Sequence, residues 1–279
     1  MRVNSITAAS RGIVSEVGRS PAGFAGLMRS LMRSLAFSAT LAAAAVAYPF
    51  MTCGGRANAQ RWRRARWLHR LCRVLTHVVG LHVRSNGWPV RSGMIVSNHL
   101  SYLDIVAYSA LTPCVFVAKK EVRDWPIFGL FARLAGTVFV DRERRTAVAG
   151  ACSEIAGAVR AGIPVVLFAE GTSSDGRGVL RFRSSLLEPA ARFDALFTPA
   201  AISYELAEGS PEMEVCYWGE MTLLPHLLNL FTKRQVEAQI AFGFPITLPP
   251  DWSRKQLAQN LHGIVSLLHA NLFNRRSLQ

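Results

Sequence analysis

The chain has 279 residues, 50% of them hydrophobic, and its 32 Lys and Arg residues against 18 Asp and Glu residues give a formal net charge of +14. This length allows one sizeable core, or one domain with an appended segment. The charge indicates an anionic partner. The positive mean hydropathy of +0.21 favours a phospholipid surface over nucleic acid, for which the sequence carries no recognisable reading module.

The N-terminal part is predicted to hold a membrane segment. Residues 1–23 show no sustained period and are expected to be disordered. The apolar run from Leu35 to Cys53 is close to the length of about 20 residues that crosses a bilayer; Pro49 is expected to end or kink a helix there. Three interpretations remain: a membrane-inserted helix or hairpin, an amphipathic interfacial stretch, and a secretory signal peptide. The first is favoured because the run is long for a signal peptide and is followed by arginines.

The arginines after this run are interleaved with Trp62 and Trp67. They are Arg56, Arg61, Arg63, Arg64, Arg66, Arg70 and Arg73. Arginine is enriched on the cytoplasmic side of membrane segments, and tryptophan is enriched at the level of the lipid head groups. We therefore expect residues 24–85 to form a membrane-anchoring helical region with both tryptophans at headgroup level. The alternative is a solvated basic helix.

From about residue 90, short apolar runs alternate with segments of helical period. The expected strands are Met94–Ser97, Val115–Lys119, Thr137–Val140, Val165–Ala169, Thr198–Ser203, Glu214–Trp218 and Gln239–Phe244. The expected helices are Tyr102–Leu111, Ile127–Leu134, Arg144–Arg160, Ser184–Arg192 and Arg254–Leu272. This alternation predicts an α/β fold with a largely parallel central sheet flanked by helices, contained in a single domain over residues 86–279.

A histidine and an aspartate stand five residues apart between an expected strand and an expected helix, in the segment SNHLSYLD at residues 97–104. In α/β sheets this is where reactive groups lie. Asp104 at this spacing can bind one ring nitrogen of His99, fix its tautomer and stabilise the imidazolium that forms when the other nitrogen takes a proton. The pair predicts a general base for a substrate hydroxyl. The alternative is a local hydrogen bond or helix cap.

A second segment, VVLFAEGTSSDG at residues 165–176, runs from an apolar strand into a polar loop. Gly171 lets the backbone approach a ligand, and hydroxyl residues such as Thr172 suit an oxygen-rich head group. Glu170 ends a buried strand, so its carboxyl must find partners or face a cleft. The segment predicts a ligand-binding loop, with an ordinary strand-to-loop turn as the alternative.

Two basic residues follow neighbouring strands. Lys119 ends the expected strand Val115–Lys119, and Arg142 follows the expected strand Thr137–Val140. An arginine in that place can bind a phosphate or a carboxylate with its bidentate fork. The alternative for Arg142 is a surface arginine in a basic run.

These segments together resemble the 1-acylglycerol-3-phosphate acyltransferase (PlsC-type) family of glycerolipid acyltransferases over about residues 92–204. The segment NHLSYLD at residues 98–104 is similar to the family's His-x4-Asp block, and residues 136–142 are similar to its second block. FAEGT at residues 168–172 and TPAAI at residues 198–202 are similar to the third and fourth blocks. The order of the four blocks makes the resemblance specific.

The resemblance implies a membrane-bound O-acyltransferase, with residues 86–279 as the acyltransferase domain. It implies transfer of a fatty acyl group from acyl-CoA or acyl-carrier protein to the free hydroxyl of a 1-acylglycerol-3-phosphate-type lysolipid in phospholipid biosynthesis. His99 is then the catalytic base and Asp104 its orienting partner. The implied substrate-binding residues are Lys119, Arg142, Glu170, Gly171 and Thr172.

The third block departs from the family pattern, which commonly reads Phe-Pro-Glu-Gly-Thr-Arg. Ala169 replaces the proline, and Ser173 stands where the family has an arginine that is implicated in holding the acceptor phosphate. Either Arg177, Arg181 or Arg183 substitutes for it, or the acceptor lacks a phosphomonoester, as lyso-ornithine lipid does. A third hypothesis is a non-catalytic basic membrane-surface protein. The stretch YWGEMTLLPH at residues 217–226 is similar to a feature of a bacterial subgroup.

Other chemistries are not indicated. The sequence has no GxSxG elbow and no P-loop, and its histidines show no metal-ligand spacing. No metal and no cofactor are expected beyond acyl-CoA or acyl-carrier protein as co-substrate. The expected partners are the lipid bilayer, the lysolipid acceptor and the acyl donor, without nucleic acid. The expected location is the inner (cytoplasmic) membrane, with the catalytic domain on its cytoplasmic face.

Overall fold

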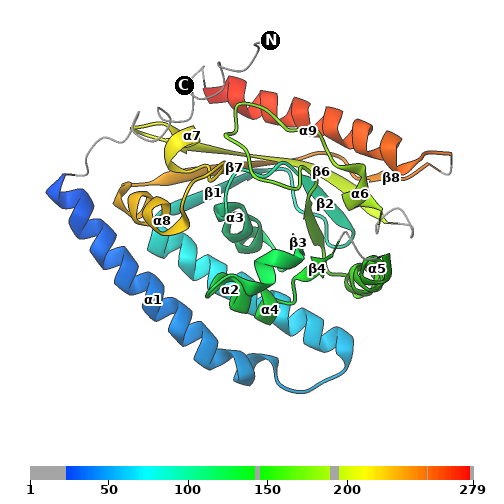
Figure 1. Cartoon of the computed structure of the whole chain (residues 1–279), viewed down its shortest axis with the longest axis horizontal. Helices are drawn as coiled ribbons and strands as arrows, with labels where there is room; N and C mark the ends of the chain where they lie inside the picture. The colour runs from blue at the N-terminus through cyan, green and yellow to red at the C-terminus, as the bar shows by residue number, and fades with distance from the viewer. Residues whose placement is uncertain (1–22, 142–144, 189–194, 250, 277–279) are drawn as a thin grey trace, which may run out of the picture.

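The computed structural model describes residues 23–141, 145–188, 195–249 and 251–276, in which one sheet lies between layers of helices (Figure 1). The strands are β1 (Leu81–Asn86), β2 (Met94–Ser97), β3 (Val115–Lys119), β4 (Val138–Val140), β5 (Val165–Phe168), β6 (Leu196–Leu206), β7 (Val236–Phe242) and β8 (Ile246–Thr247). The helices are α1 (Phe24–Thr52), α2 (Ala57–Val79), α3 (Leu103–Leu111), α4 (Phe128–Ala135), α5 (Arg145–Arg160), α6 (Ser184–Leu187), α7 (Pro211–Glu214), α8 (Leu223–Thr232), α9 (Arg254–Arg276) and the 3-10 helix η1 (Lys120–Asp124).

The strands are ordered β1-β7-β6-β2-β5-β3-β4, and β8 pairs with β6. Neighbouring strands run parallel except for β6, which is antiparallel to β7 and β8. The expected α/β fold with a largely parallel central sheet flanked by helices is confirmed. Strands buried on both faces read as continuous apolar runs, which is why β2 and β5 were recognisable in the sequence.

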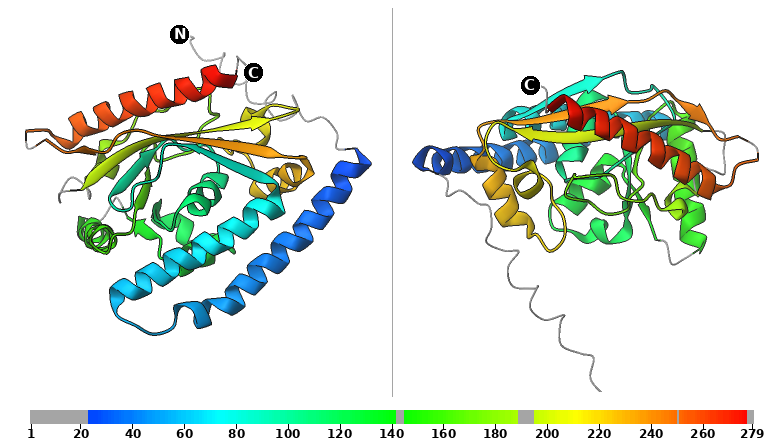
Figure 2. Two further views of the ribbon diagram at one scale, coloured as in Figure 1. Left: turned by 180° about the vertical axis from the view of Figure 1, so that it is seen from behind. Right: turned by 90° about the horizontal axis from the view of Figure 1, so that it is seen from above.

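Each face of the sheet has its own core. Side chains of successive strand residues point to opposite faces, so Ile95 packs with α2, α3 and α8, while Met94 and Val96 pack with α5, α6 and α9. Figure 2 shows α9 crossing the face opposite to α1 and α2. The helices of both layers thereby hold β2 and β5 at the centre of the molecule.

Helix α2 is a core helix with a basic outer face. Its buried residues Ala65, Leu68, Cys72 and Val79 follow the spacing of one helical face. Trp67 is 2% exposed, and its indole N–H donates to the Ala44 carbonyl of α1 at 3.1 Å. The expectation that Trp67 lies at headgroup level is therefore wrong, because its ring fills the space between α1 and α4. The indole N–H of Trp62 likewise bonds within the protein, to the Ala161 carbonyl.

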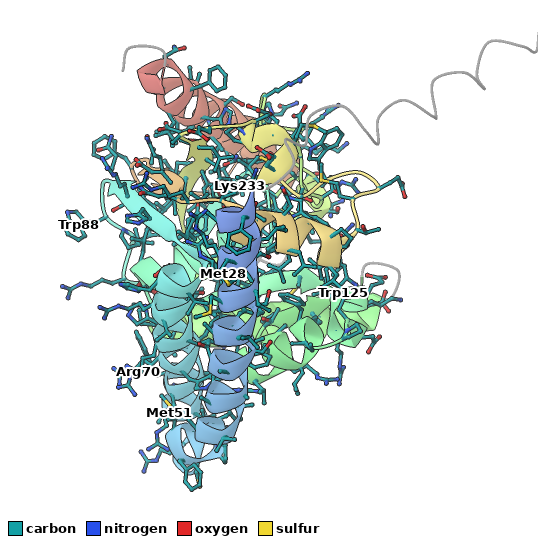
Figure 3. All side chains as sticks on the ribbon, turned by 90° about the vertical axis from the view of Figure 1, so that its left-hand side faces the viewer. Met28, Met51, Arg70, Trp88, Trp125 and Lys233 are labelled. Atoms are coloured by element: carbon teal, nitrogen blue, oxygen red, sulfur yellow. The ribbon has the colours of Figure 1, made fainter. Side chains whose placement is uncertain are left out.

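Helix α1 lies along α2 at one side of the molecule, and Met28 of α1 and Arg70 of α2 point outward there (Figure 3). By length and composition, α1 is the helix of the described chain that could cross a membrane. Its N-terminal half is fixed to α8: Arg29 and Arg33 donate to the carbonyls of Thr232 and Lys233, each at 2.6 Å. Pro49 lies inside α1 rather than at its end, three residues before the last helical residue.

The other expected elements agree with the structure within a few residues, with clear exceptions. Glu214–Trp218 is not a strand: it begins at the last residue of α7, and the indole of Trp218 bonds back to the Glu212 carbonyl. The sequence also did not predict β1, β8, α7, α8 or η1. Pro225 occupies the first turn of α8, where its missing N–H costs little.

Part of the expected helix Ser184–Arg192, and Arg144 at the start of another, lie outside the described residues, as do residues 1–22. The expected division between an anchoring region over residues 24–85 and a domain over residues 86–279 falls inside β1, whose six residues all pair with β7. Helix α2 and the sheet share one core.

Candidate active site

The candidate site lies where the adjacent strands β2 and β5 end. His99 follows β2 by two residues, and Glu170 follows β5 by two. The N–H of Ala169 donates to the Ser97 carbonyl at 3.2 Å, so the pairing of the two strands continues to the site. Parallel strands deliver their carboxyl ends to one edge of the sheet, and ligands bind there in open α/β folds.

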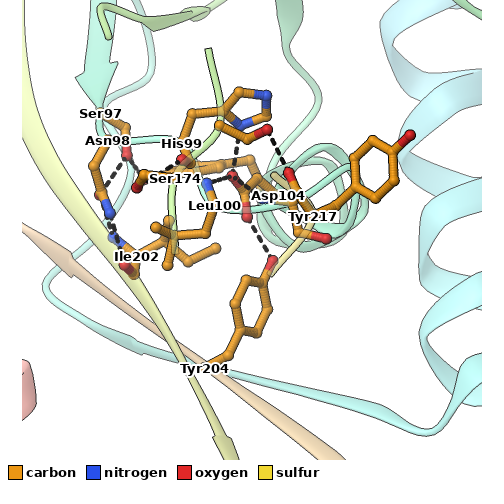
Figure 4. Close-up of polar contacts among 12 residues, drawn as sticks. Ser97, Asn98, His99, Leu100, Asp104, Ser174, Ile202, Tyr204 and Tyr217 are labelled. Atoms are coloured by element: carbon orange, nitrogen blue, oxygen red, sulfur yellow. Dashed lines mark hydrogen bonds and ion pairs between the residues drawn. The ribbon is translucent and has the colours of Figure 1, made fainter. Parts of the chain in front are cut away.

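His99 and Asp104 are in direct contact, as the sequence predicted. His99 Nδ1 lies 2.7 Å from Asp104 Oδ2 (Figure 4). Because an ionised carboxylate only accepts hydrogen bonds, Nδ1 carries the proton and Nε2 of the neutral ring is unprotonated. The His99 side chain is 23% exposed, whereas that of Asp104 is fully buried. The His99 ring is thus partly accessible, whereas the Asp104 carboxylate that binds it is shielded from water.

Asp104 is surrounded by donors. It lies in the first turn of α3, where the positive end of the helix favours an anion. Its Oδ2 also accepts from the backbone N–H groups of Leu100 and Ser101, at 2.7 and 3.2 Å. Its Oδ1 accepts from the phenol O–H of Tyr204 at 2.6 Å. These bonds compensate the loss of hydration that an ionised group suffers on burial.

Sequence reasoning missed two further residues that hold the segment around His99 in place. Phe168 of β5 stacks on the imidazole, with ring centroids 4.2 Å apart and an interplanar angle of 11°. The side-chain amide of Asn98 exchanges two hydrogen bonds with the backbone of Ile202, at 3.0 and 2.8 Å. Asn98 thereby extends the pairing of β2 with β6 beyond Ser97. Both residues lie inside the recognised blocks, so their position in those blocks was the available signal.

Glu170 is a buried carboxyl, 1% exposed. Its Oε1 accepts from the Leu180 N–H at 3.1 Å, which ties the following loop to the end of β5. Burial raises the pKa of Glu170 from 4.5 to about 8, and the charge of Asp104 adds to this, while hydrogen bonds from the backbone N–H groups of Leu180 and His99 oppose it. At neutral pH the carboxyl is therefore mostly protonated. Its predicted role in substrate binding stays a prediction.

The loop after Glu170 is tied to both neighbouring segments. Gly171 has a φ of +71°, a conformation that favours glycine. The N–H of Ser174 donates to the His99 carbonyl at 2.9 Å, and the hydroxyl of Ser173 donates to the Tyr217 carbonyl. The N–H of Tyr217 in turn donates to the Leu100 carbonyl at 2.8 Å. The predicted catalytic loop, the glycine loop and the stretch from residue 217 therefore form one unit.

That unit includes a buried histidine which the sequence did not assign. His226 of α8 is 1% exposed; its Nε2 lies 3.0 Å from the Cys216 carbonyl and its Nδ1 lies 2.9 Å from the Tyr102 hydroxyl. A carbonyl only accepts, so Nε2 carries the proton and Tyr102 donates to Nδ1. The contact connects α8 to the residue before α3.

An apolar cavity of about 410 Å³ adjoins His99. Its wall comes from α1, α2, α3 and α4 and includes Phe37, Leu68, Val106 and Phe131. This volume falls within the range of about 300–1,000 Å³ that small-molecule sites occupy. Such a wall suits a hydrocarbon chain.

Several of the predicted binding residues meet at this cavity. Gly171 and Thr172 line it, as does Lys119 from the end of β3. Among the described lining residues, Lys119 is the one Lys or Arg. Arg142 lies outside the described residues. The structure thus brings together a base, an apolar cavity and a polar loop, which is an arrangement able to activate a hydroxyl group on an amphipathic molecule.

Comparisons with known proteins identify the family. Residues 80–203 match the family model Acyltransferase. The chain is 37% identical over 219 residues to a lyso-ornithine lipid O-acyltransferase of Brucella abortus, covering 73% of this chain and 82% of that protein. It is 35% identical over 214 residues to the Rhizobium meliloti protein of the same name, covering 72% of each. The chain therefore belongs to the Acyltransferase family and is an acyltransferase.

A second set of relatives matches a shorter part. The chain is 34% identical over 111 residues to a 1-acyl-sn-glycerol-3-phosphate acyltransferase of Neisseria gonorrhoeae, covering 40% of this chain and 44% of that protein. The crystal structure of the 1-acyl-sn-glycerophosphate acyltransferase PlsC from Thermotoga maritima superimposes with a TM-score of 0.68 at 18% identity, covering 88% of this chain and 95% of that one. This likeness confirms the fold that the four sequence blocks implied.

Proposed function

We propose that this chain acylates the free hydroxyl of lyso-ornithine lipid, with acyl-CoA or acyl-carrier protein as donor. The observation that carries the proposal is the extent of the match to relatives of that name. They align over 192 to 219 residues, whereas the glycerophosphate acyltransferases align over 111 to 142. The match to the lyso-ornithine lipid O-acyltransferases therefore extends over more of this chain, 67% to 73% of it, than the match to the glycerophosphate acyltransferases, 40% to 50%.

The chemistry of the glycine loop supports this acceptor. A phosphomonoester needs concentrated positive charge, and the family's arginine would supply it. Ser173 replaces that arginine, and its hydroxyl is already committed to the Tyr217 carbonyl. Lyso-ornithine lipid presents one carboxylate and one ammonium group instead. A single cation such as Lys119 at the cavity is sufficient for the carboxylate, and Gly171 and Thr172 would contact the rest of the polar head.

In the proposed reaction His99 Nε2 takes the proton of the lysolipid hydroxyl as its oxygen attacks the thioester carbonyl carbon. Asp104 stabilises the imidazolium that forms. The tetrahedral oxyanion collapses, the C–S bond breaks, and the thiolate takes the proton back from His99. An ester and a free thiol result. Since the substrate supplies the nucleophile and the thioester is already activated, the reaction requires neither a metal nor a cofactor.

The membrane location follows from the same chemistry, since a lysolipid acceptor resides in a bilayer. The exposed apolar residues of α1 include Leu27, Leu31, Leu35 and Phe50, and they would anchor the enzyme in the lipid. The arginines of α2 beside them favour the cytoplasmic side of the inner membrane. The cavity receives wall residues from α1, so an acyl chain could pass from the bilayer to His99.

An acceptor panel tests the proposal. Purified enzyme in mixed micelles is given lyso-ornithine lipid, lysophosphatidic acid or lysophosphatidylethanolamine, each with acyl-CoA and with acyl-carrier protein. We expect the highest kcat/KM with lyso-ornithine lipid, by a factor of about ten or more over lysophosphatidic acid. A preference for lysophosphatidic acid would contradict the assignment. A Lys119→Met variant should raise KM for the preferred acceptor, whereas an Arg70→Met variant on the exposed face of α2 should not.

A further inference from the structure

The two oxygens of Asp104 are satisfied by different parts of the fold. Oδ2 accepts three hydrogen bonds, from His99 Nδ1 and from the N–H groups of Leu100 and Ser101. These donors all lie within five residues of Asp104. Oδ1 accepts from Tyr204, which is 100 residues away in the sequence. Of the donors that the structure assigns to this carboxylate, Tyr204 is therefore the one that anchors its second oxygen.

Tyr204 is well placed for this task. It lies in β6, opposite Ala238 of β7, and is 1% exposed. Burial raises the pKa of the phenol well above 10, and the neighbouring charge of Asp104 adds to the effect. The phenol therefore keeps its proton and acts as a donor. Two residues earlier in β6, the backbone of Ile202 forms two hydrogen bonds with the side chain of Asn98 (Figure 4). Strand β6 therefore holds both ends of the segment from Asn98 to Asp104.

We propose that Tyr204 is a positioning residue of the acyl transfer reaction. Its O–H holds Oδ1 of Asp104 so that Oδ2 stays aligned with Nδ1 of His99. The inference rests on the proposed function, in which His99 is the base. The charge on the imidazolium develops during the reaction, and a carboxylate that can turn or shift stabilises that charge less well. Tyr204 thus affects the chemical step without touching either substrate.

The consequence is a specific kinetic pattern. Losing a hydrogen bond to a charged group corresponds to about a 10- to 100-fold effect. Because Tyr204 contacts Asp104 and not the substrates, we expect removal of its O–H to lower kcat. The KM values for donor and acceptor should stay within about twofold of the wild type.

The test compares two buried tyrosines. Tyr204→Phe removes the phenol O–H and keeps the ring. Tyr108→Phe is the matched control, since Tyr108 is also buried and its hydroxyl pairs with Ser97 Oγ at 2.7 Å rather than with Asp104. We expect kcat to fall about 10- to 100-fold in Tyr204→Phe and to stay within about twofold in Tyr108→Phe. A kcat near wild type in Tyr204→Phe, or equal losses in both variants, would overturn the inference.

A double-mutant cycle shows whether the effect passes through Asp104. Tyr204→Phe is combined with Asp104→Asn, and we expect Tyr204→Phe to lower kcat little further once Asp104→Asn is present. Losses that multiply would contradict the positioning role. If Tyr204→Phe does not fold, Tyr204→4-fluorophenylalanine fills the volume of the hydroxyl without donating; it should show the same loss, and near-normal kcat there would also overturn the inference.

The same assay separates this inference from the proposed function. His99→Ala tests the base directly. If His99→Ala is as active as the wild type, the proposed function fails. If His99→Ala is inactive while Tyr204→Phe keeps its kcat, the proposed function stands and the role of Tyr204 is refuted.

Discussion

At the scale of single residues, the site contains two buried carboxyl groups in different environments. Asp104 accepts four hydrogen bonds and lies at the positive end of α3. Glu170 has fewer donors, and burial raises its pKa to about 8. The first environment stabilises an anion and the second favours the neutral acid. Neutral Glu170 avoids placing a second negative charge beside Asp104.

This difference predicts a pH dependence of stability. Below pH 4.5 Glu170 is protonated in both the folded and the unfolded chain. Between pH 4.5 and about 8 the unfolded chain has released a proton that the folded protein keeps, so stability falls as pH rises, by up to about 1.4 kcal/mol per pH unit. Above about pH 8 this contribution levels off. Unfolding measured from pH 5 to 9 should show the slope.

The control for that slope is a neutral isostere. In Glu170→Gln the amide oxygen can still accept from Leu180, but no proton is released, so the fall in stability between pH 5 and 8 should be smaller. Glu220→Gln, which changes an exposed carboxyl, should keep the wild-type slope. Parallel curves for wild type and Glu170→Gln would show that Glu170 does not titrate as described.

The sequence could predict those contacts of the site that join residues close together in the chain, and not those that join distant residues. His99 and Asp104 are five residues apart, so local geometry was enough to pair them. Tyr204 and Asp104 are 100 residues apart, and their contact depends on β6 lying next to β2. No spacing rule reports such a contact. The same applies to Ser173 and Tyr217, which are 44 residues apart.

At the scale of elements, the turn between η1 and α4 carries a strained residue. Ile127 has a φ of +60° and a ψ of −61°, and the N–H of Phe128 donates to the Pro126 carbonyl at 2.6 Å. These values describe a classic γ-turn, which is rare and is unfavourable for a β-branched residue. Gly129 follows, where a Cβ would lie 2.3 Å from the Arg123 carbonyl oxygen. The turn is therefore built tightly at the rim of the cavity, which Ile127 lines.

This strain predicts that, at Ile127, the glycine variant is more stable than the alanine variant, which is the reverse of the usual order in a helix. Ile127→Gly and Ile127→Ala both remove the side chain, but only glycine adopts this φ without cost. Ile127→Gly should therefore be more stable than Ile127→Ala by about 1 kcal/mol. At Leu130, inside α4, the usual order should hold, with Ala more stable than Gly by about 1 kcal/mol. The unfolding temperatures of the four variants test this prediction. A higher unfolding temperature for the alanine variant than for the glycine variant at both positions would rule out the strain.

At the scale of the whole molecule, one layer of helices serves both the core and the proposed membrane contact. Helix α2 packs on the sheet, and α1 packs on α2 and α8 with most of its large apolar residues exposed. The sequence predicted strands β2 to β7, because buried strands are continuous apolar runs, but it missed β1 and β8. It misplaced Trp67, because an aromatic between arginines has the same pattern whether it faces lipid or the core. Only the packing of α1 against α2 distinguishes the two.

The exposed face of α1 predicts how the protein partitions. Leu31 and Leu35 are 55% and 61% exposed, so Leu31→Glu with Leu35→Glu leaves the core intact. Two charges in the hydrocarbon region cost on the order of several kcal/mol, and the double variant should move from the membrane fraction to the soluble fraction. Trp88→Glu with Phe244→Glu is the control, since these residues are 88% and 91% exposed and lie in loops rather than in α1. Membrane retention equal to wild type in the α1 variant would contradict the proposed anchor.

The proposed reaction depends on one ring nitrogen of His99 accepting the proton of the lysolipid hydroxyl. The most direct test is the single-turnover rate of acyl transfer by His99→Ala, measured on a variant whose circular dichroism and unfolding temperature match those of the wild type. General-base catalysis contributes about 10²- to 10⁴-fold, so the rate should fall by at least about 100-fold. A rate within about tenfold of the wild type would contradict the assignment of His99 as the base.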